Sequence, residues 1–484
     1  MPSRPLVSCT ARARLARGAC AALLLATGGC DTINSLTKPI FGGAPPVGQV
    51  GHVTGFLGGV VADEPRAALV GRTVLSEGAN AADAATAVGF ALAVTLPSRA
   101  GLGGGGACLA YSPGKDSING GVPEAIVFVP PASEAAGGDR PAALPTLARG
   151  LFALQARYGR RPFDAMVTPA EQLARFGVQA SRALVRDLDV VARPLMADPN
   201  AAAVFAPGGQ MLTEGARLIQ PDLGATLAQL RVAGVGDMYI GALARRVADG
   251  SRLAGGPITV DQLRTTLPRV LPPVTIPSGR DEISFLPPPA DGGVAAAAAY
   301  QVLARTPSAA VEAEARSLAV LAQLRQAGGD PLAMLRAELP PAGGMGPFPA
   351  STTFATLDRD GNAVVCALTM NNLFGTGRMV PGMGFLLAAS PARITPPMLA
   401  AALAWNEHIQ GFRAETGGSG QEAAGLAAGF AMAATLQTNQ PLPVPPPDPG
   451  RANVIACSRY LPDAKGSCGW ATDPRGSGLA VGAE

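Results

Sequence analysis

The chain has 484 residues, of which 48% are hydrophobic and 15% charged, and this length fits one large α/β domain or two to three average domains. Its 61 glycines and 45 prolines are scattered among apolar residues, which excludes collagen and long disordered segments. Four of the 38 Lys and Arg residues lie in the first 30 residues, which hold no acid, so the rest of the chain has 34 basic and 35 acidic side chains. That balance argues against nucleic-acid binding.

Residues 1–30 have the pattern of an export signal. Three arginines precede the apolar run Ala19 to Thr27, which is shorter than the about 20 residues needed to span a bilayer. The run ends in Gly-Gly-Cys30, which resembles the lipobox of bacterial lipoproteins, although Thr27 stands where leucine is preferred. The resemblance implies that the protein is exported to the bacterial periplasm and lipid-anchored through Cys30. Ordinary signal cleavage nearby is the alternative, and residues 31–50 are expected to form a linker.

The folded part of the chain begins with a strand, a helix and a glycine loop. We expect a strand from Gly59 to Asp63 and a helix from Ala81 to about Leu96, capped by Asn80. The loop Gly101 to Gly106 then leads into a strand from Ala107 to Ser112. Because this loop follows a helix and precedes a strand, the reverse of a phosphate-binding loop, it is read as a tight turn beside a site.

Further along the chain, helical patterns alternate with strand patterns. Two apolar alternating stretches flank the turn Asp358 to Asn362 and predict a hairpin. The proline-rich segment Pro441 to Pro449 is expected to be a loop. Helices are expected at about 145–190, 223–250, 295–327, 396–410 and 421–437.

The cysteines outside the leader fall into two groups. Cys108 and Cys366 lie in apolar strand-like stretches and are read as small buried residues. Cys457 and Cys468 lie close together in a loop-rich tail, where an oxidising compartment favours a disulfide, although both could remain free thiols. No pattern of a zinc site is present.

The available chemistry points to an enzyme that needs neither histidine nor metal nor any other cofactor. His52 and His408 are the only histidines, and neither lies in a catalytic motif. An N-terminal nucleophile is compatible with the absence of a catalytic histidine. In enzymes of this design the chain cleaves itself, and the freed α-amine of a Ser, Thr or Cys acts as the base.

Two segments, Gly59 to Asp63 and Glu77 to Gly106, resemble the signature of the γ-glutamyltranspeptidases. The resemblance implies an α/β (α+β) fold, a four-layer αββα sandwich of the N-terminal nucleophile hydrolase type. It also implies cleavage of one precursor into a large-subunit region, 51–350, and a small-subunit region, 351–484, which stay associated as one composite domain. Further matches in the same order are Tyr158-Gly159, Pro169 to Gly177, Leu286 to Gly293 and Asp473 to Gly478.

The same resemblance implies the site residues. Cleavage falls between Ala350 and Ser351, which makes Ser351 the nucleophile where the family has threonine, with Thr352 as the alternative. Thr369 corresponds to the threonine that contacts the nucleophile, and Asn371 to the substrate-binding asparagine. The Gly417-Gly418 pair corresponds to the oxyanion-hole donors, with a helix-capping turn as the alternative interpretation.

Two departures concern substrate recognition. Val129 stands where the family has the arginine that binds the substrate α-carboxylate, and Ala388 to Arg393 replaces the acidic segment that binds the α-amine. Three hypotheses follow. The protein acts on γ-glutamyl amides such as glutathione, with water or an amine as acceptor; or it takes a different acyl group; or it is a non-catalytic envelope scaffold.

Overall fold

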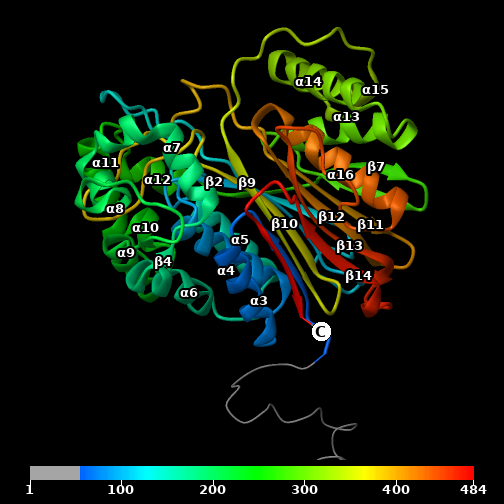
Figure 1. Cartoon of the computed structure of the whole chain (residues 1–484), viewed down its shortest axis with the longest axis horizontal. Helices are drawn as coiled ribbons and strands as arrows, with labels where there is room; N and C mark the ends of the chain where they lie inside the picture. The colour runs from blue at the N-terminus through cyan, green and yellow to red at the C-terminus, as the bar shows by residue number, and fades with distance from the viewer. Residues whose placement is uncertain (1–54, 484) are drawn as a thin grey trace, which may run out of the picture. The chain divides into compact units, whose positions relative to one another are not determined.

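Two antiparallel sheets lie face to face at the centre of the computed structural model, and helices cover the outer face of each (Figure 1). The structure describes residues 55–483. The predicted signal 1–30 with Cys30, the linker 31–50 and His52 therefore lie outside the described residues. The helix–sheet–sheet–helix order is the expected four-layer αββα sandwich, which is confirmed.

The first sheet has seven strands and contains the segment that follows the predicted cleavage point. Its central strands β9 (Ser351–Asp358) and β10 (Ala363–Thr369) form the predicted hairpin, in which Ser351 lies opposite Thr369. In spatial order the sheet consists of β15 (Leu479–Ala483), β1 (Gly58–Ala62), β9 (Ser351–Asp358), β10 (Ala363–Thr369), β2 (Gly105–Tyr111), β3 (Glu124–Phe128) and β6 (Arg269–Leu271).

The second sheet has six strands and packs its inner face against the first. Its order is β14 (Cys468–Thr472), β13 (Arg451–Leu461), β12 (Gly411–Ser419), β11 (Ala400–Asn406), β8 (Asp281–Phe285) and β7 (Val274–Ser278). The core between the two sheets is apolar and contains Val61, Leu109 and Ala355 from the first sheet and Leu403 and Ile455 from the second.

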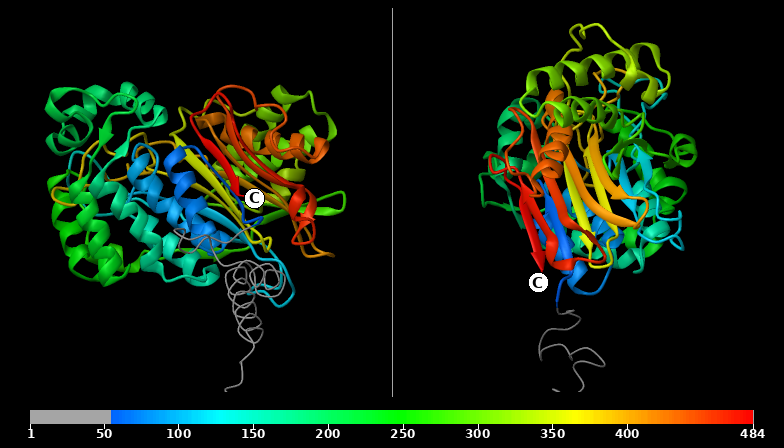
Figure 2. Two further views of the ribbon diagram at one scale, coloured as in Figure 1. Left: turned by 60° about the horizontal axis from the view of Figure 1, so that its bottom comes forward. Right: turned by 90° about the vertical axis from the view of Figure 1, so that its right-hand side faces the viewer.

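The two helical layers have different origins in the sequence. The layer on the first sheet comes from the predicted large-subunit region, and that on the second combines helices of both predicted regions (Figures 1 and 2). The first layer contains α3 (Pro65–Ser76), α4 (Ala81–Thr95), α5 (Leu147–Tyr158), α6 (Phe163–Phe176), α7 (Arg182–Met196), α8 (Pro199–Phe205), α9 (Pro221–Ala233), α10 (Asp237–Ile240), α11 (Ala242–Leu253) and α12 (Val260–Thr265). The second contains α13 (Gly292–Arg305), α14 (Ala310–Ala327), α15 (Pro331–Arg336) and α16 (Ala424–Thr438).

Helix α4 is fixed to the hairpin by a chain of backbone and side-chain contacts. Asn80 and Asp83 form a reciprocal capping box at its N-terminus, as the sequence signal indicates. The buried Asp358 carboxylate accepts a hydrogen bond from the Ala81 N–H at 3.1 Å and also binds the turn through the Asn362 side chain at 2.8 Å. The start of the buried helix and the β9–β10 turn are therefore held together, which fixes the direction of β9.

The helix expected at 396–410 is wrong. Residues 400–406 form β11, a central strand of the second sheet that pairs with β8 and β12. Its alanines favour helix locally, but a strand covered on both faces shows no polar–apolar alternation. Tertiary pairing therefore overrides the local preference.

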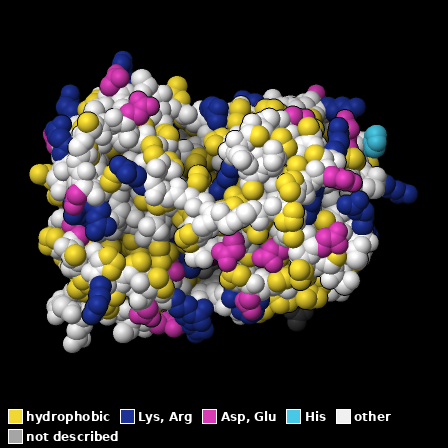
Figure 3. Space-filling model, turned by 90° about the horizontal axis from the view of Figure 1, so that it is seen from above, with side chains coloured by type: hydrophobic (Ala, Val, Ile, Leu, Met, Phe, Trp, Pro, Cys, Tyr) yellow, Lys and Arg dark blue, Asp and Glu magenta, His cyan; other side chains and the backbone are white. Residues whose placement is uncertain are grey.

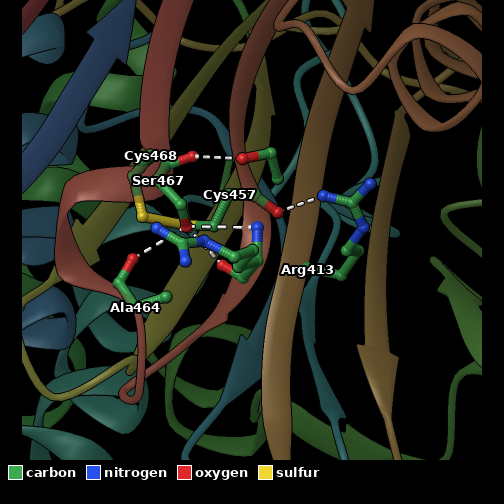
Figure 4. The surroundings of a disulfide bond; sticks show 7 residues. Arg413, Cys457, Ala464, Ser467 and Cys468 are labelled. Atoms are coloured by element: carbon green, nitrogen blue, oxygen red, sulfur yellow. Dashed lines mark hydrogen bonds between the residues drawn. A yellow bond between two sulfur atoms is a disulfide. The ribbon is translucent and has the colours of Figure 1, made fainter.

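The structure pairs all four cysteines in its described part into disulfides. Cys108 and Cys366 are buried, as expected, but they are joined across β2 and β10, which corrects their reading as unlinked small residues. The two are 258 positions apart in the sequence and become direct neighbours only through the sheet register. The Cys457–Cys468 disulfide links β13 to β14, and the Arg413 guanidinium donates to the Cys457 carbonyl beside it (Figure 4).

Charged side chains of both signs are interspersed over the face seen from above (Figure 3). This distribution agrees with the nearly neutral balance of the sequence. His408 is exposed. None of the helices within residues 55–483 is long and apolar enough to cross a membrane.

Candidate active site

Ser351 is the first residue of β9 and lies at the wall of a cleft of 540 Å³. The side chain is only 1% exposed, and its buried Oγ has no hydrogen-bond partner among the described residues. Residues 347–350 line the same cleft, so the peptide bond between Ala350 and Ser351 lies at the cleft surface. Burying a hydroxyl without a partner costs free energy, and a role in attack on the neighbouring carbonyl would explain why this group is retained.

Thr369 places a hydroxyl on the peptide group that precedes Ser351. It is the last residue of β10 and lies opposite Ser351 in the ladder. Its Oγ1 donates to the Ala350 carbonyl at 3.1 Å, while the Asn371 backbone N–H donates to the same Oγ1 at 2.9 Å. The second contact orients the Thr369 hydroxyl toward the oxygen of the carbonyl group that the nucleophile would attack.

Asn371 is buried behind the cleft wall. Its side-chain amide donates to the carbonyls of Pro130 at 3.2 Å and Ala389 at 3.0 Å, so it ties together two segments that flank the site. Its Oδ1 is buried and has no partner among the described residues. Asn372, the next residue, lines the cleft directly.

Gly417 and Gly418 lie inside β12, paired with β11 on one side and β13 on the other. A Cβ on Gly417 would stand 2.6 Å from the Thr353 Cβ, and one on Gly418 would stand 2.2 Å from the Ala424 carbonyl oxygen. Their small size therefore allows β12 to approach β9 and α16 closely. The turn ahead of Gln421 begins at Gly420, which has a φ of +118°, and Ser419, Gly420 and Gln421 line the cleft.

Asp63 joins the two sheets beside the nucleophile. One carboxylate oxygen accepts hydrogen bonds from Thr352 Oγ1 at 2.9 Å and the Thr353 N–H at 3.0 Å, and the other accepts from Asn453 Nδ2 at 2.8 Å. The hydroxyl of Thr352, the alternative nucleophile, is thus engaged with Asp63. Asp63 lies in one of the family-like segments of the sequence, but no role could be predicted for it or for Asn453. Only the pairing of the sheets brings these two residues together.

Two partly buried ion pairs, each with a buried carboxylate, line the cleft and were not predicted from the sequence. Asp187 on α7 accepts two hydrogen bonds from the Arg99 guanidinium, at 2.6 and 2.7 Å, and one from Ser98 Oγ at 2.6 Å. Burial disfavours the charge on Arg99, but the Asp187 carboxylate outweighs this effect and raises the pKa of Arg99 above its usual value. On the opposite wall, Asp473 binds Arg475 at 2.6 and 2.9 Å.

Val129 and the segment Ala388 to Arg393, which replace the family's two substrate-recognition elements, do not line the cleft. Val129 packs against the core between the sheets, and Ala388 is buried in the core beneath the first helical layer. Within residues 55–483 there is no cluster of three or more His, Cys, Asp or Glu side chains suited to a metal ion.

Comparison with known proteins places this architecture in one family. The model of the γ-glutamyltranspeptidase family matches residues 67–328, more than half of the chain. The chain is 28% identical to a glutathione hydrolase proenzyme of Escherichia coli strain K12, over 71% of this chain and 69% of the relative. It is 30% identical to the acylase ACY 1 proenzyme of Pseudomonas sp. strain V22, over 69% of each.

The solved structures support the fold. A cephalosporin acylase from Bacillus halodurans superposes with a TM-score of 0.71 at 18% identity, covering 90% of this chain and 98% of that one. The γ-glutamyltranspeptidase of Helicobacter pylori gives a TM-score of 0.50 at 24% identity, over 61% of this chain and 88% of that one. From the fold, the site and the family match together, the chain belongs to the γ-glutamyltranspeptidase family, whose members are amide-bond hydrolases and transferases.

Proposed function

We propose that this protein is an exported, self-processing amidohydrolase and acyltransferase in which Ser351 is the nucleophile. The observation that carries the proposal is the contact of the Thr369 hydroxyl with the Ala350 carbonyl, beside the unpaired Oγ of Ser351. A donor on this carbonyl stabilises the oxyanion that forms when a hydroxyl attacks.

The first reaction is cleavage of the chain itself. The Ser351 Oγ attacks the Ala350 carbonyl carbon, its proton passes to the Ser351 nitrogen, and the carbon–nitrogen bond breaks to leave an ester. Water then hydrolyses the ester, which gives a carboxylate at Ala350 and a free α-amine at Ser351. The segment 347–350 can then leave the cleft that it lines.

The second reaction is turnover of a small amide. An α-amine has a pKa of about 7.7 to 8, so the freed amine of Ser351 can take the proton from its own hydroxyl near neutral pH. The hydroxyl attacks the substrate carbonyl, the leaving amine takes up the proton, and water or another amine releases the acyl group. Thr369 then orients the nucleophile.

The bond we propose is a γ-glutamyl-type amide, as in the substrates that the names of the glutathione hydrolases indicate. A different acyl group is the second candidate. It is favoured by Val129 and Ala388, which leave the two recognition positions without a cation or an anion, and by the similarity to a protein named as an acylase. Turnover of γ-glutamyl-p-nitroanilide by the purified protein separates the two candidates.

The test of the nucleophile is the intact mass of the purified protein and of two variants. We expect the wild type and Thr352→Ala to contain a small chain of residues 351–484, and Ser351→Ala to remain a single chain. Cleavage in Ser351→Ala but not in Thr352→Ala would transfer the role to Thr352. A single chain in all three would refute self-processing and favour the non-catalytic scaffold.

We also propose that residues 1–30 are removed on export and that Cys30 carries a lipid, on the sequence pattern alone. Labelling of cells with a fatty-acid probe should mark the wild type and not Cys30→Ala. Equal labelling of both, or of neither, would refute the anchor.

A further inference from the structure

Almost all of the charged side chains that line the cleft form ion pairs or hydrogen bonds with other residues of the protein. Arg99 pairs with Asp187, and Arg475 with Asp473, each at 2.6 Å. Arg451 binds Asp448 at 2.8 Å. The last lining carboxylate, Asp63, is occupied by the donors described above. The lining as a whole therefore has few charges left for a ligand.

Arg186 is the exception. It lines the cleft and is exposed, and its side chain forms neither a hydrogen bond nor an ion pair with any residue from 55 to 483. Arg186 lies on α7, a helix whose first turn is capped by Ser181. Asp187, the residue after Arg186, accepts hydrogen bonds from Arg99 and Ser98. The backbone of Arg186 is thus anchored to the cleft wall while its guanidinium is free to bind.

An apolar side chain lies one turn further along the same helix face. Val190 also lines the cleft and is 76% exposed. Residues four apart on a helix are neighbours, so Arg186 and Val190 together present a cation next to an apolar surface. This pair fits a ligand that has an anionic group at the end of an apolar body.

We propose that Arg186 is a specificity-determining residue that binds an anionic group, such as a carboxylate, of the amide substrate cleaved at Ser351. Every carboxylate that lines the cleft already has a partner within residues 55–483, so the lining offers no unpaired anion to an ammonium group. The substrate carboxylate can belong to the acyl group or to the leaving amine. The inference rests on the proposed function, and it assigns to α7 the recognition that Val129 cannot supply.

The experiment compares three anilides with purified, self-cleaved protein. Glutaryl-p-nitroanilide carries its carboxylate on the acyl group, the amide of butyric acid with 5-amino-2-nitrobenzoate carries it on the leaving amine, and the glutaryl methyl ester anilide carries none. The variants are Arg186→Gln, Arg186→Lys and the control Arg182→Gln, which removes an exposed arginine one turn earlier that pairs with Glu214.

In Arg186→Gln we expect KM to rise about tenfold or more for one of the two carboxylate anilides, since a hydrogen bond to a charged group contributes about 1.5 to 3 kcal/mol. For the responding anilide kcat should change less than about threefold, and so should both kcat and KM for the neutral ester. A change of that size is smaller than the effect expected from losing a hydrogen bond to a charged group. Arg186→Lys should recover part of the loss, and Arg182→Gln should behave as wild type. The anilide that responds identifies the side of the substrate that carries the anion.

Two results would overturn the proposal. One is an unchanged KM for both carboxylate anilides in Arg186→Gln, and the other is an equal loss on the neutral ester, which would indicate a structural role. If the cleaved wild type turns over neither these anilides nor γ-glutamyl-p-nitroanilide, the proposed function fails separately from this inference. Glutarate binding to wild type and Arg186→Gln, measured by calorimetry, then decides the inference, and equal or absent binding in the two refutes it.

Discussion

If the chain is cut before Ser351, its two parts should remain covalently joined. Cys108 lies in the large-subunit region and Cys366 in the small-subunit region, and their disulfide crosses directly between β2 and β10. The Cys457–Cys468 disulfide lies wholly within the small-subunit region and serves as an internal control. The perturbation is the double substitution Cys108→Ala with Cys366→Ala, matched by Cys457→Ala with Cys468→Ala.

The size of the effect follows from the sequence separation. In the uncut chain the Cys108–Cys366 bond closes a loop of 258 residues, and the chain-entropy relation gives about 5.5 kcal/mol of stabilisation for that length. Cleavage before Ser351 opens this loop. The bond then stabilises the pair of chains in a different way, because it holds them at an effective concentration of the order of millimolar and prevents their separation on dilution.

The assay is denaturing electrophoresis after free thiols have been blocked. Without reductant, wild type and the Cys457/Cys468 variant should each run as one species that contains both chains, and with reductant as two. The Cys108/Cys366 variant should run as two species in both conditions. Two separate chains from unreduced wild type, with cleavage confirmed by mass, would refute the reasoning. In the uncut Ser351→Ala background, an unfolding free energy unchanged by loss of the Cys108–Cys366 bond would refute the stated magnitude.

Three further predictions concern single residues. Thr369→Val should slow cleavage of purified precursor about a hundredfold or more, because it removes a donor from the Ala350 carbonyl, and an unchanged time course would contradict this role. Glu415 is fully buried with neither carboxylate oxygen hydrogen-bonded to a described residue, and burial raises its pKa well above the usual value. The unfolded chain therefore releases this proton at lower pH than the folded one, so wild type should lose up to about 1.4 kcal/mol of stability per pH unit between the unfolded and the folded pKa. Glu415→Gln should match wild type near pH 4 and exceed it in thermal midpoint at pH 8, and a constant difference across pH would refute the assignment. Gly417→Ala places a Cβ 2.6 Å from the Thr353 Cβ, so the thermal midpoint should fall by an amount equivalent to about 1 to 3 kcal/mol, and an unchanged midpoint would mean that the two sheets can separate at no cost.

Part of the fold is encoded in short segments and could be predicted from them. The turn between β9 and β10 follows from an Asp-Gly sequence between apolar stretches, and the start of α4 follows from Asn80 and Asp83 three positions apart. These signals depend on residues close together in the chain, so they can be recognised without knowledge of the rest of the structure. Ser351 and Thr369 belong to the same hairpin, but the hairpin signal predicts only that they lie in adjacent strands, and the roles expected of them come from the resemblance to the family.

The remaining features depend on contacts between residues far apart. The alanines of β11 carry no signal that distinguishes a central strand from a buried helix, and only pairing with β8 and β12 decided the outcome. The Cys108–Cys366 bond, the Asp63–Asn453 contact across the sheets and the position of Arg186 on the cleft wall were likewise decided by the tertiary structure. The sequence by itself determined the hairpin through local order and the family through motifs spread along the chain, and the roles expected of Ser351 and Thr369 follow from that resemblance. The register of two sheets sets which distant side chains meet, and that register is a property of the whole packed chain.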